Sequence, residues 1–304
     1  MLSPMTENGN NQKLASSPLL QEKRRRSSLP ILILAVLFVS ATFLTWYYTW
    51  FGRELGDQEI GNYLADEKHP RHVQHALLQI ERRLEQGNSN CCQRWYPQIL
   101  MLTGSPETEF RMTAAWLMGY DNKSEEFHQA LLKLLRDREP LVRRNAALAL
   151  VRFNDSSGRA DLLATLKPFP VAAPANGVVD STLNEGSPVS RGTLLARIKE
   201  TNGLVFEVRS PLPGRIEKVV SANGANITNG GTVLTLNSDA NSLWEALRGL
   251  ALIGKTEDLS EIERYAQGVA SLPDRIKQQA ALTAKAIQSR SAQQDQKGQA
   301  SLTQ

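Results

Sequence analysis

Residues 171–236 form two halves that echo each other, and this duplication constrains the fold of the 304-residue chain more than any other feature. Pro174 and Gly177 of the first half return 37 positions later as Pro211 and Gly214. Two later glycines return 38 positions on, Gly186 as Gly224 and Gly192 as Gly230. Short alternating apolar runs separate the glycines, as expected for β-strands joined by turns in which glycine adopts a positive φ. The duplication predicts a small β domain made of two similar halves.

The motif order through the two halves points to a known kind of domain. It runs APxxGxV, then EGxxVxxGxLLAxI, then EVRSPxxGxI, between Ala173 and Ile216. This order resembles the biotinyl/lipoyl family, and the resemblance implies a flattened barrel of two interlocked four-stranded sheets. If it carries no biotin or lipoyl group, this domain is similar to the lipoyl-like domain of periplasmic membrane-fusion adaptor proteins. Those proteins usually have a long helical hairpin at the tip, which this chain lacks.

In carrier domains of this family, the modified lysine stands at the tip of the hairpin that joins the halves. Here Asn202 or Gly203 occupies the tip and Lys199 precedes it, so Lys199 is the only carrier candidate. Asn-Gly is the strongest two-residue hairpin signal, which predicts a plain turn. We therefore expect no cofactor, a solvated Lys199, and a candidate interaction tip made of Glu200, Thr201, Asn202, Gly203 and Leu204.

The segment from Leu29 to Phe51 is almost wholly apolar and contains no charged residue. About 20 such residues cross the hydrocarbon core of a bilayer, so the segment predicts a transmembrane helix at 29–51. Aromatic residues crowd its far end and a basic cluster, residues 23–26, precedes it. This pattern predicts a single span of the inner membrane, with the N-terminus in the cytoplasm and the body periplasmic or otherwise extracytoplasmic. The alternative is a signal-peptidase site at Val39-Ser40-Ala41.

Charge is concentrated before the apolar segment. Residues 1–28 are rich in Asn, Gln, Ser and Pro and predict a disordered cytoplasmic tail. Of the 35 basic and 31 acidic residues of the chain, five and two lie in this tail, so the remainder is almost balanced. A nucleic-acid-binding protein needs a basic face on its folded body, and this balance argues against such a partner.

From residue 56 to 167 the apolar residues recur with a helical period. An amphipathic stripe follows Ser124, and the next helix begins at Pro140, where the missing N–H costs nothing. Arg111 and the alanines after it return 32 positions later at Arg143. A helix-pair repeat of this period is typical of an α-solenoid. The motif LLKLLRDREPLVRRNAALALVRF resembles HEAT repeats of the short bacterial type, over residues 109–165.

The helical pattern resumes after the β domain. An apolar stripe at 243–251 ends at Gly254, and residues 273–281 echo the helix that begins at Pro140. The chain therefore predicts a multidomain α plus β fold, in which a HEAT-like α-solenoid is interrupted by a biotinyl/lipoyl-like β barrel-sandwich domain. The predicted parts are the tail (1–28), the span (29–51), HEAT-like repeats (56–167), the β domain (168–238), C-terminal helices (240–290) and a flexible tail (291–304).

His69, His72 and His75 are spaced three apart at the start of a helix that includes Pro70. Residues i and i+3 share a helix face, so two of the three could hold a metal ion. The competing interpretation is a solvated first turn, because no acidic residue lies between the histidines. The three are weak metal candidates, and the missing H-E-x-x-H motif argues against a zincin-type peptidase.

Cys91 and Cys92 are adjacent, in a stretch rich in Asn, Ser and Gly. An oxidising compartment would favour disulfides, but adjacent cysteines pair only through a strained eight-membered ring. A vicinal bridge, an intermolecular bridge and two buried thiols therefore stay open.

The chain has no nucleophile-elbow, Walker A or dinucleotide-binding motif, which argues against an enzyme. We expect a membrane-anchored scaffold or adaptor that binds other envelope or membrane proteins, within an export or envelope assembly, or copies of itself. Trp95 and Trp116 are further candidate contacts, with core packing as the competing interpretation. Two alternatives stay open. One is a degenerate biotin/lipoyl-type carrier or accessory subunit of a membrane enzyme complex, and the other is a sensor that uses the histidines or cysteines.

Overall fold

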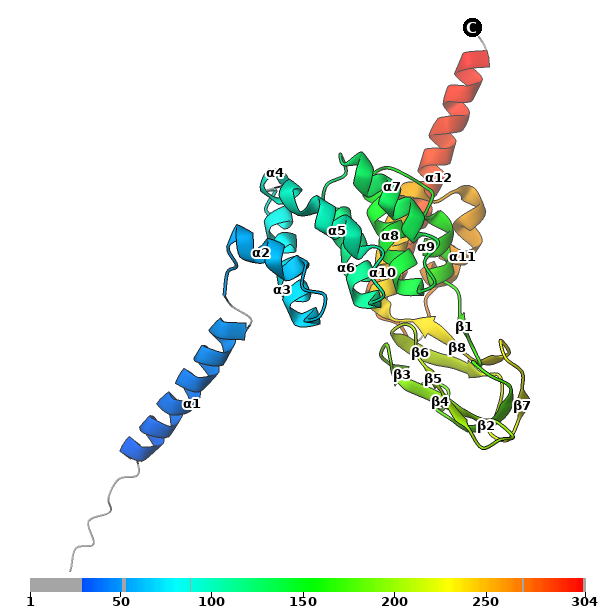
Figure 1. The fold of residues 1–304 in the computed structure, drawn as a ribbon. Coiled ribbons are helices and arrows are strands. Elements are labelled where there is room, and N and C mark those ends of the chain that lie inside the picture. Colours follow the sequence, from blue (N-terminus) through cyan, green and yellow to red (C-terminus); the bar gives the residue numbers. More distant parts are fainter. Residues whose placement is uncertain (1–28, 51–52, 88, 270, 303–304) are drawn as a thin grey trace, which may run out of the picture. The chain divides into compact units, whose positions relative to one another are not determined.

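The computed structural model describes residues 29–50, 53–87, 89–269 and 271–302 (Figure 1). The tail predicted at residues 1–28 lies outside the described residues. The chain divides into two compact units, residues 1–53 and 54–304. Helix α1 belongs to the first unit, and every later helix and strand belongs to the second.

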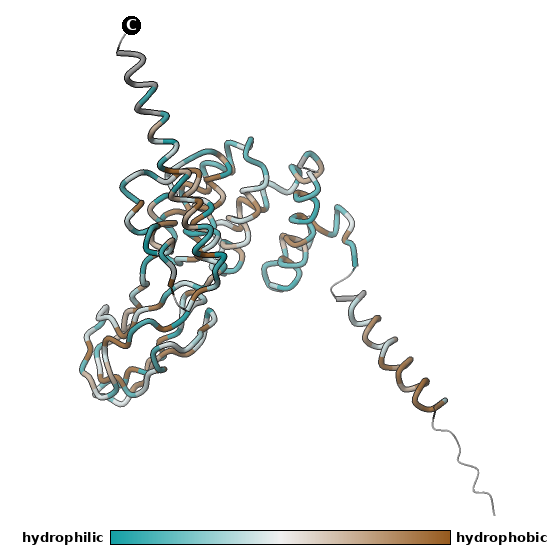
Figure 2. Tube along the Cα trace, turned by 180° about the vertical axis from the view of Figure 1, so that it is seen from behind, coloured by the Kyte–Doolittle hydropathy of each residue, from teal (hydrophilic) through white to brown (hydrophobic). Residues whose placement is uncertain are grey.

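Helix α1 (Leu29–Trp50) is apolar on every face. Its residues Leu29–Tyr47 are long and apolar enough to cross a membrane, and none of their side chains is buried. In Figure 2 the hydrophobic colour is concentrated in the first turns of this helix. A helix that is apolar all round needs a nonpolar environment. A signal sequence near the N-terminus meets the same criterion, so the helix is either a single span or a signal sequence.

The helices of the second unit pack mainly in pairs: α2 with α3, α5 with α6, α7 with α8, α9 with α10, and α11 with α12. The second helices of successive pairs also touch, so that α3, α6, α8, α10 and α12 form a continuous row. The bounds are α2 (Asp57–Leu64), α3 (Pro70–Glu85), α4 (Ser89–Cys92), α5 (Tyr96–Leu102), α6 (Thr108–Met118), α7 (Glu125–Leu134), α8 (Pro140–Arg152), α9 (Arg159–Thr165), α10 (Ala240–Ile253), α11 (Leu259–Ala266) and α12 (Asp274–Leu302), with short 3-10 helices at Gln93–Trp95 and Thr256–Asp258.

The ends of these helices follow from local sequence. The Ser124 hydroxyl accepts a hydrogen bond from the Phe127 N–H at 3.3 Å and caps α7, as predicted. Pro140 is the first residue of α8, also as predicted. The Asp239 carboxylate accepts the first N–H groups of α10, and Gly254 ends that helix. The apolar stripe of α7 is buried, which gives the helix its packing energy.

The strands lie between α9 and α10 in the sequence and form two antiparallel four-stranded sheets. One sheet has the order β1-β8-β6-β3 and the other β5-β4-β2-β7. Exchanging β1–β4 with β5–β8 converts one order into the other, so the sequence duplication is also a structural one. Each sheet takes strands from both halves. The bounds are β1 (Phe169–Ala172), β2 (Gly177–Thr182), β3 (Pro188–Val189), β4 (Leu194–Lys199), β5 (Val205–Arg209), β6 (Gly214–Val219), β7 (Asn226–Ile227) and β8 (Thr232–Ser238).

The recurring glycines of the strands have two different physical roles. Four lie in turns with positive φ, as predicted: Gly186 (79°), Gly192 (82°), Gly224 (85°) and Gly230 (81°). The other two, Gly177 and Gly214, need glycine for a different reason. A Cβ on Gly177 would lie 2.5 Å from the Lys199 carbonyl oxygen, and one on Gly214 would lie 2.1 Å from the Asn237 carbonyl oxygen. A neighbouring strand therefore approaches too closely for any side chain.

The tip between β4 and β5 is a five-residue loop, and the predicted two-residue Asn-Gly turn is wrong. A type I′ turn needs positive φ at both residues, but of the two only Gly203 has it, at 85°. The Glu200 N–H donates to the Leu204 carbonyl oxygen (2.9 Å) and closes the loop. The Asn202 side-chain oxygen accepts from the Leu204 N–H (2.9 Å), so it stabilises the loop without a left-handed backbone.

After β8 the chain returns to the helices. Helix α10 packs on α8 and α9, and apolar residues of all three share one buried core. The Ser238 hydroxyl donates to the Thr165 carbonyl oxygen at 2.8 Å, which ties the two ends of the strand region together.

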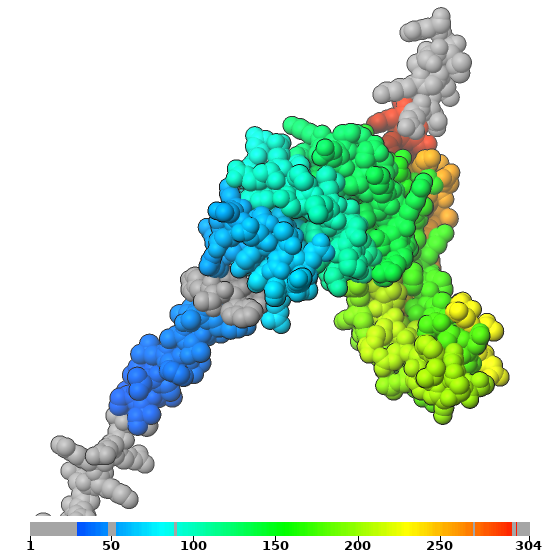
Figure 3. All heavy atoms as spheres, in the orientation of Figure 1, coloured from blue at the N-terminus to red at the C-terminus, as the bar shows by residue number. Residues whose placement is uncertain are grey.

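The chain from residue 291, predicted to be a flexible tail, continues as helix α12 to Leu302. In the space-filling view, the atoms of α5 to α9 form one continuous body (Figure 3).

Candidate functional site

Two arginines, 32 positions apart in the sequence, repeat the same set of contacts. Arg111 and Arg143 each donate from Nη1 to the carbonyl oxygens five and six residues before them. Each also pairs with an aspartate further along the array, Arg111 with Asp137 at 2.7 Å and Arg143 with Asp161 at 3.2 Å. These pairs join successive helix pairs, which is the nearest-neighbour contact expected of a solenoid.

The first of these ion pairs is nearly buried, with Arg111 7% and Asp137 9% exposed. Burial alone would raise the pKa of Asp137. Hydrogen bonds from Arg111 and from the Glu139 N–H outweigh it and hold the pKa below its usual value. The carboxylate is therefore ionised at neutral pH and stabilises the fold together with its partner.

A groove of about 230 Å³ crosses α6, α8 and α10. We name it the aromatic–arginine groove, because two tryptophans and two arginines dominate its lining. It is lined by Trp116, Leu148, Ala149, Val151, Arg152, Trp244, Glu245, Arg248, Gly249 and Leu252. Helices on both sides of the strand region in sequence thus build one surface.

One wall of the groove is an aromatic pair covered by Arg152. The Arg152 guanidinium lies 5.2 Å from the ring centre of Trp116 and 4.6 Å from that of Tyr120. Glutamates of α3 fix both rings: the Trp116 Nε1–H donates to Glu81, and the Tyr120 hydroxyl donates to Glu85, each at 2.8 Å. Burial and the bond to Glu85 raise the pKa of Tyr120 to about 12, so its hydroxyl stays protonated. This wall is therefore held in place before any partner binds.

The other wall belongs to α10. The Arg248 guanidinium lies 4.6 Å above the Trp244 ring, and the Leu252 side chain is 66% exposed. A Cβ on Gly249 would lie 2.7 Å from the Leu162 side chain, so glycine lets α10 approach the neighbouring helix closely. Close approach places both walls within reach of one bound segment.

The groove offers apolar area and two exposed guanidinium groups together. Arg152 and Arg248 are exposed, and neither has a carboxylate within 4.0 Å in the described part of the chain. With their faces on aromatic rings, the guanidinium edges remain able to donate to an acceptor. Trp, Tyr and Arg are the residues enriched at the energetic centres of protein interfaces. The arrangement can bind a segment that brings carboxylates beside apolar side chains.

Of the two tryptophans predicted as contacts, the structure keeps one. Trp95 is only 2% exposed and packs in the hydrophobic core shared by α2 to α8, with Arg83 and Arg94 over its ring. Its predicted exposure is therefore wrong, and the competing interpretation of core packing is correct. Trp116 is half-buried and lines the groove. Sequence reasoning missed Trp244 and Arg248, although their i, i+4 spacing along the edge of the apolar stripe of that helix could have revealed them.

Lys199 and the tip lie at one end of the strands. Lys199 is exposed at the end of β4, where its backbone is paired with Val178 on one side and Val205 on the other. It stands in the strand, before the loop 200–204 that forms the tip. Leu204 is 57% exposed, so the tip presents an apolar side chain among polar ones.

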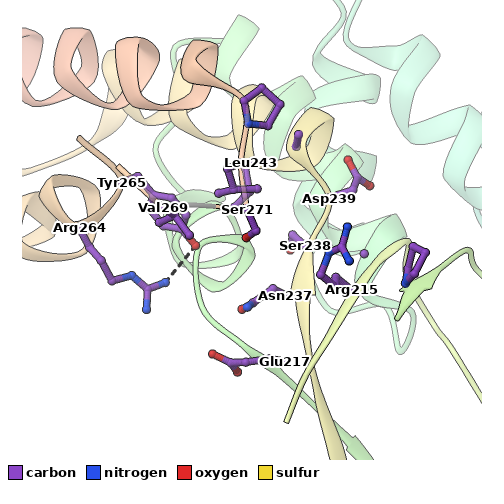
Figure 4. Close-up of a pocket in the computed structure, with 15 residues that line it drawn as sticks. Arg215, Glu217, Asn237, Ser238, Asp239, Leu243, Arg264, Tyr265, Val269 and Ser271 are labelled. Atoms are coloured by element: carbon purple, nitrogen blue, oxygen red, sulfur yellow. Dashed lines mark hydrogen bonds between the residues drawn. The ribbon is translucent and has the colours of Figure 1, made fainter. Parts of the chain in front are cut away.

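A cavity of about 490 Å³ lies between the strands and the C-terminal helices (Figure 4). Arg264 and Tyr265 lie on one side, and Glu217 and Asn237 come from strands. Arg264 donates to the Leu166 carbonyl oxygen (2.9 Å) and the Tyr265 hydroxyl (3.0 Å). The bond from Arg264 to the Leu166 carbonyl oxygen joins α11 to the end of α9.

The predicted histidine cluster is rearranged. His69 and His72 converge on Asp66, a residue the sequence reasoning did not include, with their donor atoms within 4.8 Å of one another. His75 instead lies 3.1 Å from the Gln79 side chain, nitrogen to nitrogen, and is not part of this group. Asp66 could have been found from the sequence, because it lies three residues before His69 and so continues the spacing of the histidines.

Cys91 and Cys92 lie in the short helix α4, and neither forms a disulfide. Their Sγ atoms are 3.6 Å apart. Cys92 is fully buried in the hydrophobic core shared by α2 to α8, whereas Cys91 is half-buried. Burial and the contact with Cys91 raise the pKa of Cys92 to about 12, so that thiol stays protonated.

A family model of HEAT repeats matches residues 97–170, and this part of the chain consists of HEAT-like repeats. No curated protein matches the chain. Among solved structures, that of a single-chain, multi-domain long-chain acyl-CoA carboxylase is similar to 33% of this chain and 11% of that one. The identity is 17% and the TM-score 0.23, a level that does not identify a fold. The HEAT-like repeats include Trp116 and Arg152, one wall of the groove.

Proposed function

We propose that this protein is a membrane-anchored, envelope-facing, non-catalytic scaffold or adaptor that binds another protein through the aromatic–arginine groove. The observation that carries the proposal is the pairing of Arg152 with Trp116 and Tyr120 beside the pairing of Arg248 with Trp244. HEAT repeats generally mediate protein–protein interactions, and their row of second helices offers an extended surface.

The chemistry of the groove selects the partner segment. Neither arginine has an ion pair within 4.0 Å among the described residues, so an acidic segment gains two charge-assisted hydrogen bonds when it binds. The exposed Leu252 side chain and the two indole rings favour apolar or aromatic side chains between the acidic ones. The expected partner is a protein with an exposed acidic and aromatic segment.

The strand region supports a second part of the proposal, a biotinyl/lipoyl-like domain that serves as another docking module. The exchange symmetry of its two strand orders supports this assignment. The position of Lys199 inside a paired strand favours docking over a carried group. An export or envelope assembly is the partner complex suggested by analogy with adaptor proteins.

Photocrosslinking in native membranes tests the proposal. A photoreactive residue replaces Leu252 in the groove or, as a matched control, Met101 of α5, which is 72% exposed. We expect a discrete product from position 252 only, with the crosslink mapped by mass spectrometry to an acidic segment of the partner. The charge reversals Arg152→Glu and Arg248→Glu together should abolish it. Equal products from both positions, or capture that survives the charge reversals, would contradict the proposal.

A further inference from the structure

Three metal-binding side chains meet at the turn between α2 and α3. Asp66 lies in the turn, His69 directly precedes α3, and His72 is in its first turn. One donor atom from each lies within 4.8 Å of the other two. We propose that Asp66, His69 and His72 bind one zinc ion, with solvent as the fourth ligand.

The backbone directs all three side chains to one point. The His69 N–H donates to the Asp66 carbonyl oxygen (3.0 Å), and the His72 N–H donates to the His69 carbonyl oxygen (2.8 Å). Each of these bonds closes a turn, and the first and fourth residues of such a turn lie close together. The spacing D-x-x-H-x-x-H therefore places three ligands on one side of the chain.

Both oxygens of the Asp66 carboxylate face imidazole nitrogens. His69 Nδ1 lies 2.9 Å from Oδ1 and 2.8 Å from Oδ2, and His72 Nδ1 lies 2.8 Å from Oδ2. Hydrogen bonds from His69 and then His72 hold the pKa of Asp66 below its usual value. An ionised carboxylate and two imidazoles form the nitrogen and oxygen donor set that zinc accepts.

A helix N-terminus accounts for only part of this arrangement. The positive end of the helix dipole favours a carboxylate such as that of Asp66. A capping carboxylate would accept from the first backbone N–H groups of α3, whereas both oxygens of Asp66 are occupied by side-chain nitrogens. The convergence of two imidazoles on it has no role in capping.

The site is supported on one side and open on the other. The ring of Tyr63, from α2, stacks on His72 with 4.3 Å between ring centres and 15° between planes, which holds the imidazole in place. His69 is 66% exposed and His72 is 42% exposed, so solvent reaches the fourth position. Zinc with three protein ligands and one open position is common. Here the ion would clamp the turn after α2 to the first turn of α3.

Zinc binding needs the lone pair of each Nδ1. A neutral ring then carries its proton on Nε2, and a ring that was protonated releases one proton to solvent.

Calorimetric titration of the purified, metal-stripped full chain with zinc chloride tests the site. We expect one zinc ion per chain. Asp66→Asn, His69→Ala and His72→Ala should each weaken binding by about 10-fold or more. His75→Ala, which removes an imidazole from the same helix but outside the site, should change affinity by less than about twofold.

Because the three ligands are partly exposed, these variants should fold, and their melting temperatures without zinc provide the check. An absence of saturable zinc binding by the wild-type chain would overturn the proposal. An effect of His75→Ala as large as that of His72→Ala would overturn it equally, because the ligand set would then be a different one.

Discussion

The helical array and the strand region are both built from internal repeats, but they assemble them differently. In the array each helix pair contacts its neighbours, and Arg111 and Arg143 repeat one set of bonds from pair to pair. In the strand region each sheet takes strands from both halves. A destabilising substitution in one helix pair should therefore affect mainly that pair and its neighbours. A destabilising substitution in one half of the strand region should affect both sheets.

Gly214→Ala should have the largest effect. The new Cβ would lie 2.1 Å from the Asn237 carbonyl oxygen, and backbone cannot move aside as a side chain can. We expect a destabilisation of about 3 kcal/mol or more. Hydrogen exchange should show loss of protection in β1–β8 while α5–α8 stay protected. Gly177→Ala should behave alike, and a large difference between the two would contradict the exchange symmetry of the halves.

Arg111→Ala should have the next largest effect, confined to the array. It removes a nearly buried ion pair with Asp137 and two bonds to turn carbonyls, and we expect a loss of about 2 kcal/mol. Arg143→Ala is the matched control, because its ion pair is more exposed, at 29% and 23%, and we expect about 1 kcal/mol. Urea unfolding measures both. Equal losses would contradict the role of burial.

The same ion pair should make the array sensitive to acid. The folded pKa of Asp137 lies below its ordinary value of 3.8, so its contribution is present above that value and is lost as the pH falls through the lower folded pKa. The wild-type chain should lose more stability between neutral pH and the acid range than Arg111→Ala does. Parallel pH profiles of the two proteins would contradict this assignment.

Gly186→Ala should have a smaller effect than Gly214→Ala. Its φ is 79°, but a Cβ there would meet no atom within 4 Å. The cost is then only that of a left-handed backbone, about 1–2 kcal/mol. Thermal unfolding compares it with Gly214→Ala. A loss as large as that of Gly214→Ala would show that turn conformation, not strand approach, limits this region.

Much of the fold could be predicted from the sequence because its signals are local. Pro140, Ser124 and Gly254 mark helix ends, and the positive φ of Gly186 and Gly224 follows from turn chemistry. The close approach at Gly177 and Gly214 could not be predicted, because it depends on strands far away in the sequence. The prediction of a two-residue Asn-Gly turn failed for a different, local reason, since the bond from the Glu200 N–H to the Leu204 carbonyl oxygen closes a longer loop.

The candidate sites were harder to predict, because they combine residues from separate segments. Trp116 and Trp244 lie on opposite sides of the strand region in the sequence, yet line one groove. Asp66 lies close to two of the three predicted histidines, while His75 contacts the Gln79 side chain instead. Trp95 shows the reverse case, an aromatic residue predicted as a contact that the core buries.

Excision of the strand region tests the central claim most directly, that the helices before and after it form one array with one groove. Residues 168–238 are replaced by a short Gly-Ser linker. A short linker suffices because the Ser238 hydroxyl bonds to the Thr165 carbonyl oxygen, so the two ends of the excised region lie close together. We predict that α10–α12 keep their hydrogen-exchange protection and that crosslinking from position 252 persists. Loss of protection in α10–α12 together with loss of the crosslink would contradict the account.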